Sequence, residues 1–273
     1  MLDIPTPRRR SSVMPFPALF VSHGAPNLIL HNSEARSFLA GYGRMIGRPA
    51  AIIAISAHFE TDRPTVVTDA HPGMIYDFGG FEPELREIVY PAPGDPDLAA
   101  TVKAWLEEAG MAVDTATRRG YDHGTWVPLA LLYPDGDIPV VQLSVQPYAG
   151  PAHHVAIGKA LAPLRDESVL IVGSGSFTHN LGEIFRHIAT PDAPAVAEAK
   201  AFAEWTTQKL LDGATDDLVH YRERAPHAAH NHPTEEHFLP LFAAMGAGNG
   251  AGARHVHASH QYGALMMDAF AFD

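Results

Sequence analysis

The chain has 273 residues, of which 46% are hydrophobic and 18% are charged, so it can bury a substantial core. Its formal net charge of −12 argues against a nucleic-acid-binding protein, for which a basic face is the usual feature, and against attraction to anionic membrane surfaces. The sequence has no cysteine, which excludes disulfides, thiolate nucleophiles and cysteine-ligated metal sites. Any bound metal must therefore be held by nitrogen and oxygen atoms.

The amino-terminal segment is predicted to differ from the rest of the chain. Residues 1–14 include three consecutive arginines that no apolar stretch follows, so this segment does not resemble a secretory signal. No part of the sequence reaches the roughly 18 apolar residues that a membrane span needs. We predict a disordered leader over residues 1–15, a single domain over residues 16–273, and a soluble, cytoplasmic protein that binds neither nucleic acid nor membranes.

In the first half of the chain, strand-like runs precede a long loop and a helix. The runs Ala18–Ser22, 51–57 and 65–68 predict strands, because they are aliphatic and lack polar alternation. Residues 74–93 are rich in glycine and proline and predict a loop long enough to be functional. A helix is expected over residues 95–110, where an aspartate–proline pair supplies the N-cap and first turn and a glycine supplies the stop.

In the second half, strands and helices alternate. Apolar runs predict strands over residues 138–145 and 169–174. Helical spacing predicts helices over residues 151–165, 193–211 and 234–246, the last with two glutamates in its positive first turn. This alternation predicts an α/β fold, a single domain with a central, largely parallel sheet flanked by helices.

Several histidines follow the predicted strands. His23 comes directly after the first strand, His58 directly after the second, and His179 a short turn after the run 169–174. Residues just past the carboxyl ends of neighbouring parallel strands share one crevice, so these side chains are expected to converge. Imidazole is the commonest metal ligand and an acid/base near neutral pH, so the sequence predicts a metal-centred active site.

A third ligand has to come from elsewhere, and His237 is the best candidate. It is expected in the first turn of the last predicted helix, anchored by the apolar residues that follow. Successive helix residues point about 100° apart, so Glu235, Glu236 and His237 cannot all face one metal. For any one of these histidines taken alone, burial with an ordinary hydrogen bond is the more common situation.

Seven motifs distributed over the chain carry a family resemblance. They run from about residue 17 to residue 270 and form an ordered, specific set. They read PALFVSHGAP, AIIAISAHFET, HPGMIYDFGGFEPELREIVYPAPGDP, GYDHGTWVPLALLYPDGDIPVVQLSVQ, SGSFTHNL, HPTEEHFLPLF and YGALMMDAF. Together they resemble the class III extradiol ring-cleavage dioxygenases, in particular the DOPA 4,5-dioxygenase branch. Residues 16–273 are then expected to form one catalytic domain.

The resemblance implies a role for each of five histidines. It implies that His23, His58 and His237 bind a non-haem Fe(II), that His179 is the catalytic acid/base, and that His123 lines the substrate pocket and contacts substrate or oxygen. The wider class often has a carboxylate where His237 stands, and the neighbouring glutamates leave a carboxylate ligand open. The implied reaction opens a catechol ring with O₂ to give a muconic semialdehyde-type product.

Two other functions fit the same residues. Three neutral imidazoles also suit Zn²⁺, so Zn(II) is the alternative metal. The first alternative function is a zinc hydrolase that uses metal-bound water as the nucleophile. A non-catalytic relative that uses the fold for binding is the second, although a pure binder needs no proton donor at His179. A homodimer is the default expectation for a soluble enzyme.

Other residues in or near these motifs fit either a structural role or a role in the site. Tyr262 fits a core position as well as a contact with the substrate ring, and the segment 71–81 fits packing as well as a pocket wall. His123 could instead pair with Asp122 in a loop. The remaining histidines considered are predicted to lie at the surface or at helix ends, with His232 near the site entrance: His153, His154, His227, His230, His232, His255, His257 and His260.

Overall fold

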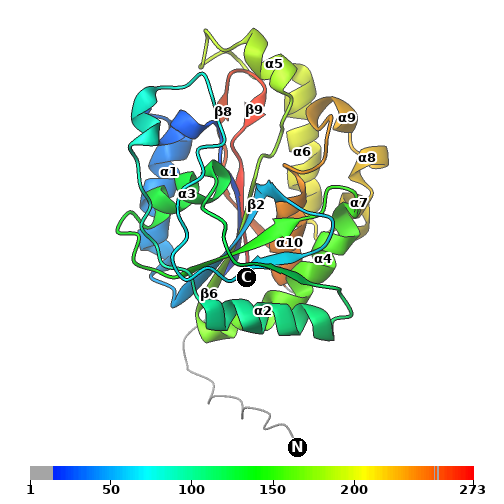
Figure 1. The fold of residues 1–273 in the computed structure, drawn as a ribbon. Helices are drawn as coiled ribbons and strands as arrows, with labels where there is room; N and C mark the ends of the chain where they lie inside the picture. The colour runs from blue at the N-terminus through cyan, green and yellow to red at the C-terminus, as the bar shows by residue number, and fades with distance from the viewer. Residues whose placement is uncertain (1–14, 249, 251) are drawn as a thin grey trace, which may run out of the picture.

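A sheet of eight strands forms the centre of the protein, described here from a computed structural model (Figure 1). The structure describes residues 15–248, 250 and 252–273, so the predicted leader over residues 1–15 lies outside the described residues except for Pro15. The strands follow the order β4-β3-β5-β2-β6-β1-β10-β7. They are β1 (Ala18–Ser22), β2 (Ala51–Glu60), β3 (Thr65–Val67), β4 (Asp114–Ala116), β5 (Val140–Val145), β6 (Val169–Gly175), β7 (Ala253–His257) and β10 (Ala269–Phe272).

The centre of the sheet is parallel, as the sequence predicts. Strands β5, β2, β6 and β1 are parallel neighbours, and every residue of β1, β5 and β6 is buried. Antiparallel pairing occurs where β3 meets β5 and where β10 joins β1 and β7. The prediction of a largely parallel α/β sheet is confirmed, whereas β7, β10 and the small hairpin of β8 (His260–Gln261) and β9 (Leu265–Met266) were not predicted.

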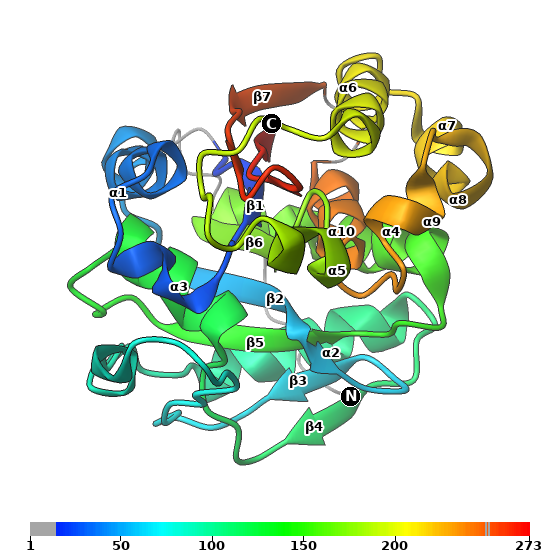
Figure 2. The ribbon, with the colours of Figure 1, turned by 90° about the horizontal axis from the view of Figure 1, so that it is seen from above.

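Helices cover both faces of the sheet (Figure 2). One hydrophobic cluster packs the sheet against α2, α4, α6 and α10, and a second packs the opposite face against α1 and α3. None of the helices among the described residues has the length and apolar character needed to cross a membrane. The helices are α1 (Glu34–Ile46), α2 (Pro96–Glu108), α3 (His123–Leu132), α4 (Gly150–Leu161), α5 (Leu181–Arg186), α6 (Ala197–Leu211), α7 (Thr215–Val219), α8 (Tyr221–Arg224), α9 (Ala228–Asn231) and α10 (Leu239–Ala247), with 3-10 turns at Pro26–Ile29, Pro83–Arg86 and Ala162–Glu167.

Prolines account for the changed boundaries of predicted helices, whereas α1, α3, α5, α7, α8 and α9 were not predicted. The segment predicted as one helix over 151–165 divides into α4 and a 3-10 turn at Ala162–Glu167, which contains Pro163. The predicted helix over 193–211 begins only at Ala197, beyond Pro194. Proline has no backbone N–H and disfavours helical geometry in the residue before it, so a helix interior rarely accommodates it.

Helices α4 and α10 pack so closely that a glycine is required between them. A Cβ at Gly158 would lie 2.0 Å from the carbonyl oxygen of Ala243. We therefore expect Gly158→Ala to lower the free energy of unfolding by about 3 kcal/mol, because the two helix backbones would have to separate. Urea denaturation followed by circular dichroism measures this change.

The matched control for this substitution is Gly41→Ala in α1. A Cβ at Gly41 has no neighbour within 4 Å, so only helix propensity changes, and the variant should gain up to about 1 kcal/mol. Equal stabilities of the two variants would contradict the close packing of α4 against α10.

Candidate functional site

Two of the predicted histidines lie at the carboxyl ends of β1 and β2, the two strands that flank β6. His23 directly follows β1, and its backbone N–H donates to the carbonyl of Gly175 at the end of β6 (2.9 Å). His58 lies inside β2, which continues to Glu60 past the predicted end, with a shift of register after Ile55.

His237 reaches the same place from a turn. The predicted helix start at Thr234 is wrong, because α10 begins at Leu239 with Pro240 in its first turn. The missing N–H of a proline costs least at the start of a helix, which sets this boundary. The carbonyl of His237 accepts instead from the backbone N–H of Ser176 (2.8 Å), so the turn is fixed against the end of β6.

The Nε2 atom of His58 lies close to the Nε2 atoms of the other two histidines. The Nε2 of His58 lies 3.2 Å from the Nε2 of His23 and 3.3 Å from the Nε2 of His237. In each ring, the Nδ1 atom points away from this cluster and faces an oxygen atom. These oxygens are Ser174 Oγ (3.1 Å from His23), Asp77 Oδ2 (3.3 Å from His58) and Glu236 Oε1 (2.9 Å from His237).

The tautomers follow from these contacts. The hydroxyl of Ser174 donates to the carbonyl of Gly124, so it accepts from the Nδ1–H of His23. Glu236 likewise accepts from the Nδ1–H of His237, and the carboxylate of Asp77, 3.3 Å from Nδ1 of His58, favours a proton on that nitrogen. The three Nε2 atoms are then all unprotonated acceptors, which cannot hydrogen-bond to one another.

This cluster of acceptors fits a metal cation. Two nitrogens that each lie about 2.1 Å from one ion are about 3.0–3.4 Å apart for bond angles between about 90° and 110°. The observed spacings of 3.2 and 3.3 Å fall in this range. A histidine that binds a metal through Nε2 commonly donates its Nδ1–H to an oxygen, as His23 and His237 do here, and Nδ1 of His58 faces the carboxylate of Asp77.

Burial keeps these imidazoles neutral. It lowers the pKa of His23 and of His237 well below the usual value, and neighbouring histidines lower both further. Burial and the nearby His123 lower the pKa of His58 to about 4, against the opposing effect of carboxylates. A neutral imidazole is the form that binds a metal, so all three are in that form at neutral pH.

The other two predicted site residues lie beside this cluster. The ring of His179 stacks on the ring of His237, with centroids 3.5 Å apart and planes inclined by 10°. Its backbone N–H donates to the carbonyl of Asn231 (2.8 Å), and burial lowers its pKa to about 4. The ring of His123 lies 4.0 Å from that of His58 and 5.4 Å from that of His23, centroid to centroid.

His123 differs from its sequence interpretation in two ways. It is the first residue of α3 rather than a loop residue, with Asp122 as the N-cap that accepts from the backbone N–H of Thr125 (2.9 Å). The carboxylate that contacts its ring is Asp77, with Oδ1 2.8 Å from Nδ1.

Burial alone would raise the pKa of Asp77, but the hydrogen bond from His123 and the neighbouring imidazoles lower it to about 2. Sequence reasoning missed Asp77, which lies in the long loop that was predicted to be functional.

Two groups of side chains have the geometry to hold a metal within the described residues. They are His23, His58 and His123, and His179, Glu236 and His237, with ligand atoms no more than 4.8 Å apart in each group. The short contacts from His58 to His23 and His237 join the two groups. Glu235 lies in neither, because its Oε2 accepts from the hydroxyl of Tyr221 (3.0 Å).

Two histidines predicted to lie at the surface or at helix ends are fully buried. His232 Nε2 faces the carbonyl oxygen of Phe177 (3.0 Å), and the segment that carries it holds the turn before His179. His154 lies within α4, where Nε2 accepts from the backbone N–H of Gln146 (3.1 Å) and Nδ1 donates to the carbonyl of Gly150 (2.8 Å). Both predictions are wrong, because each ring satisfies a buried backbone group.

His154 gives the protein a measurable pH dependence of stability. Burial lowers its pKa from 6.5 to about 4, so below about pH 6.5 the unfolded chain gains a proton that the folded chain excludes. The stabilisation from keeping His154 neutral in the folded protein is complete above pH 6.5. Below that pH the free energy of unfolding falls by up to about 1.4 kcal/mol per pH unit, down to about pH 4. We expect His154→Gln to lose less stability than the wild type between pH 7 and pH 5, measured by urea denaturation of the metal-free proteins. Parallel pH profiles would contradict this assignment.

The other residues considered near the motifs differ in whether they reach the histidine cluster. Phe78 lies edge-on to the ring of His123, with centroids 5.9 Å apart, so part of the segment 71–81 reaches the site. His71 is exposed. Tyr262 lies in the turn of the β8–β9 hairpin and lines a separate pocket of about 420 Å³ with residues that include Asn27 and Asp192.

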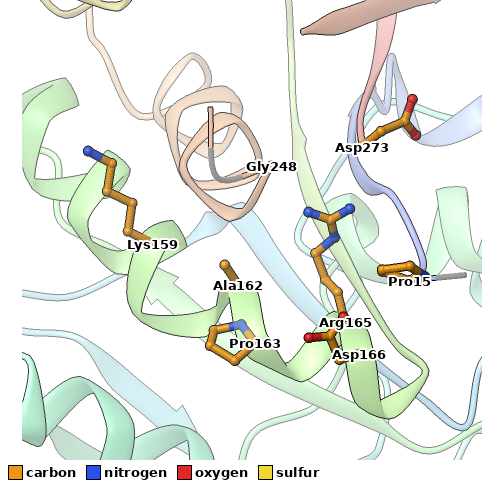
Figure 3. Close-up of a pocket in the computed structure, with 8 residues that line it drawn as sticks. All are labelled: Pro15, Lys159, Ala162, Pro163, Arg165, Asp166, Gly248 and Asp273. Carbon is orange, nitrogen blue, oxygen red and sulfur yellow. The ribbon is translucent and has the colours of Figure 1, made fainter. Parts of the chain in front are cut away.

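A pocket of about 410 Å³ lies far from the histidines (Figure 3). It is lined in part by Pro15, which precedes β1, and by Arg165 and Asp166, which precede β6. These residues lie at the amino ends of the parallel strands, whereas the histidines lie at the carboxyl ends. Arg165 donates to the carbonyls of Phe16 (2.5 Å) and Ala247 (2.8 Å), so its role there is structural.

Comparisons with known proteins agree with the geometry. Residues 26–271 match the family described as the catalytic LigB subunit of aromatic ring-opening dioxygenase. The 4,5-DOPA dioxygenase extradiol of Beta vulgaris is 42% identical over 259 residues, covering 93% of this chain and 95% of that protein. The protein of that name from Escherichia coli K12 is 38% identical over 238 residues, 86% of each chain. A crystal structure of an Escherichia coli K12 protein has a TM-score of 0.80 at 33% identity and covers 94% of this chain and 100% of that chain.

The similarity extends over nearly the whole architecture described above. The family match begins at the 3-10 turn that follows His23 and ends within β10, so it includes every strand of the sheet except β1 and both helical layers. The identity is high enough, over enough of each chain, to establish common descent rather than a shared fold alone. The chain therefore belongs to the LigB family of class III extradiol dioxygenases, which are aromatic ring-cleavage enzymes.

Proposed function

We propose that this protein is a non-haem Fe(II)-dependent extradiol dioxygenase that opens the ring of a catecholic substrate with O₂ and gives a muconic semialdehyde-type product. One observation carries the proposal. The unprotonated Nε2 atoms of His23, His58 and His237 converge at spacings of 3.2 and 3.3 Å, with two further histidines beside them. A cytoplasmic location is part of the proposal, because a chain without cysteine gains no disulfide from an oxidising compartment.

In this proposal three residues hold the metal and two act on protons. His23, His58 and His237 are the ligands, and their oxygen partners fix the orientation of each ring. When bound, ferrous iron supplies the electron transfer that lets a catecholate react with O₂, and both oxygen atoms enter the product. The chain itself has to bind the catechol, orient it and move its protons.

His179 is the proposed acid/base. Burial lowers its pKa to about 4, so it is neutral at pH 7 and free to accept a proton from a catechol hydroxyl. Held against His237, it can return that proton as the ring opens. His123, on the other side of His58, is proposed to hydrogen-bond the substrate or oxygen, with Phe78 as a wall beside it.

A zinc hydrolase is the second candidate, because a set of three imidazoles is a usual catalytic zinc site. The deciding experiment is anaerobic reconstitution with Fe(II) or Zn(II), followed by O₂-electrode measurements with a panel of catechols that includes L-DOPA. We expect the Fe(II) protein to consume one O₂ per catechol and form a yellow product, and the Zn(II) protein to consume none. Absence of O₂ uptake with every catechol, together with ester or amide hydrolysis by the Zn(II) protein, would favour the hydrolase.

A further inference from the structure

Asp77 contacts two of the site histidines at once. Its Oδ1 accepts from the backbone N–H (3.1 Å) and the Nδ1–H (2.8 Å) of His123. Its Oδ2 lies 3.3 Å from Nδ1 of His58. Both carboxylate oxygens therefore face imidazoles whose ring centroids are 4.0 Å apart.

The fold holds Asp77 in this position through its backbone. Met74 forms a parallel bridge with Tyr121, two residues before His123. The N–H of Ile75 donates to the carbonyl of Tyr121, and the N–H of Tyr121 donates to the carbonyl of Gly73, both at 2.8 Å. The loop is thus fixed alongside the segment that leads into α3, and Asp77 follows this fixed part directly.

We propose that Asp77 is a positioning residue that couples the metal site to the proposed substrate contact at His123. One carboxylate accepts the Nδ1–H of His123, a proposed substrate contact, and lies 3.3 Å from Nδ1 of His58, a proposed ligand, where its charge favours a proton on that nitrogen. Both rings are thereby held in the tautomer that leaves Nε2 unprotonated, on His58 towards the metal. The inference rests on the proposed function for the role of His123, but its effect on metal binding requires only that His58 is a ligand.

The same loop supplies a matched control. Glu82 also accepts from a histidine, with Oε1 2.6 Å from Nε2 of His31, but that histidine is exposed and lies outside the cluster. Glu82→Gln and Asp77→Asn therefore make the same chemical change in one loop. Asp77 is 24% exposed, so loss of its charge should leave the fold intact.

The test measures zinc affinity and imidazole tautomers. Competition with a chromophoric chelator should show that Asp77→Asn raises the Kd for Zn(II) about 10- to 100-fold, whereas Glu82→Gln leaves it unchanged. In the metal-free proteins, ¹H–¹⁵N correlation spectra of the imidazoles should show that His58 and His123 lose their preference for the Nδ1–H tautomer only in Asp77→Asn. A merely structural role would lower the Tm of the metal-free protein without changing the tautomers.

Each outcome decides the inference. Asp77→Asn with wild-type zinc affinity and unchanged Nδ1–H signals would overturn it, and so would loss of affinity that only accompanies a lower Tm. If Asp77→Asn does not fold, Asp77→Glu replaces it, since its longer side chain displaces the oxygens, and wild-type zinc affinity there would also overturn the inference. A wild-type protein that binds Zn(II) tightly but never consumes O₂ with Fe(II) would contradict the proposed function alone.

Discussion

His23→Ala, His58→Ala and His237→Ala should each lose tight binding of a divalent metal while remaining folded. Each substitution removes one of three neutral donors, and two imidazoles with solvent hold a metal far more weakly than three. The effect should be greatest for His58→Ala, because both short Nε2 contacts involve that ring. Elemental analysis after reconstitution and desalting measures the metal content, and circular dichroism checks the fold.

The control for these variants is His220→Ala. His220 is exposed in a turn, and among the polar contacts of the described residues its side chain contacts only the backbone carbonyl and carboxylate of Asp216 (2.8 and 3.4 Å). It should keep full metal content. Full occupancy in any one of the three variants would remove that residue from the proposed ligand set, and full occupancy in all three would end the proposal of a metal site there.

His179→Ala should keep the metal but reduce kcat by a factor on the order of 10² or more, the usual effect of removing a general acid/base. The ring contacts His237 only by stacking, so its loss leaves all three proposed donors and their oxygen partners in place. Steady-state O₂ uptake by the Fe(II)-loaded variant measures kcat, and elemental analysis confirms that iron is present.

The outcome for His179 separates two roles. A fall in kcat at full iron content supports proton transfer, whereas loss of iron from His179→Ala would make this residue a ligand or a support for one. An unchanged kcat would reject any catalytic role. His220→Ala again provides the control and should keep the wild-type kcat.

The strands and the convergence of the site could be predicted because their signals are local. The runs that became β1, β2, β5 and β6 are aliphatic without polar alternation, and parallel strands bring their carboxyl ends together. His23 and His58 could therefore be placed near each other from sequence. His237 lies beside His58, but it stands in a turn and not in the first turn of a helix, because Pro240 places the start of α10 at Leu239.

What could not be predicted depends on contacts between distant segments. Asp77 lies in a loop without periodicity, and only the bridge from Met74 to Tyr121 brings it beside His123. The short strands β7 and β10 gain their stability from pairing with each other and with β1, far away in sequence. The burial of His154 and His232 likewise follows from backbone groups that need a partner, which no local pattern reveals.

The distance along the chain between His23 and His237 has a consequence for the maturation of the enzyme. With the proposed ligands, no fragment that lacks either end of this span can form the complete site, so metal uptake follows folding. A bound ion then joins the first strand to the segment before α10 as a removable cross-link, and free metal at 100 times its Kd would stabilise the native state by about 2.7 kcal/mol. Iron supply would in this way control the lifetime of the protein as well as its activity.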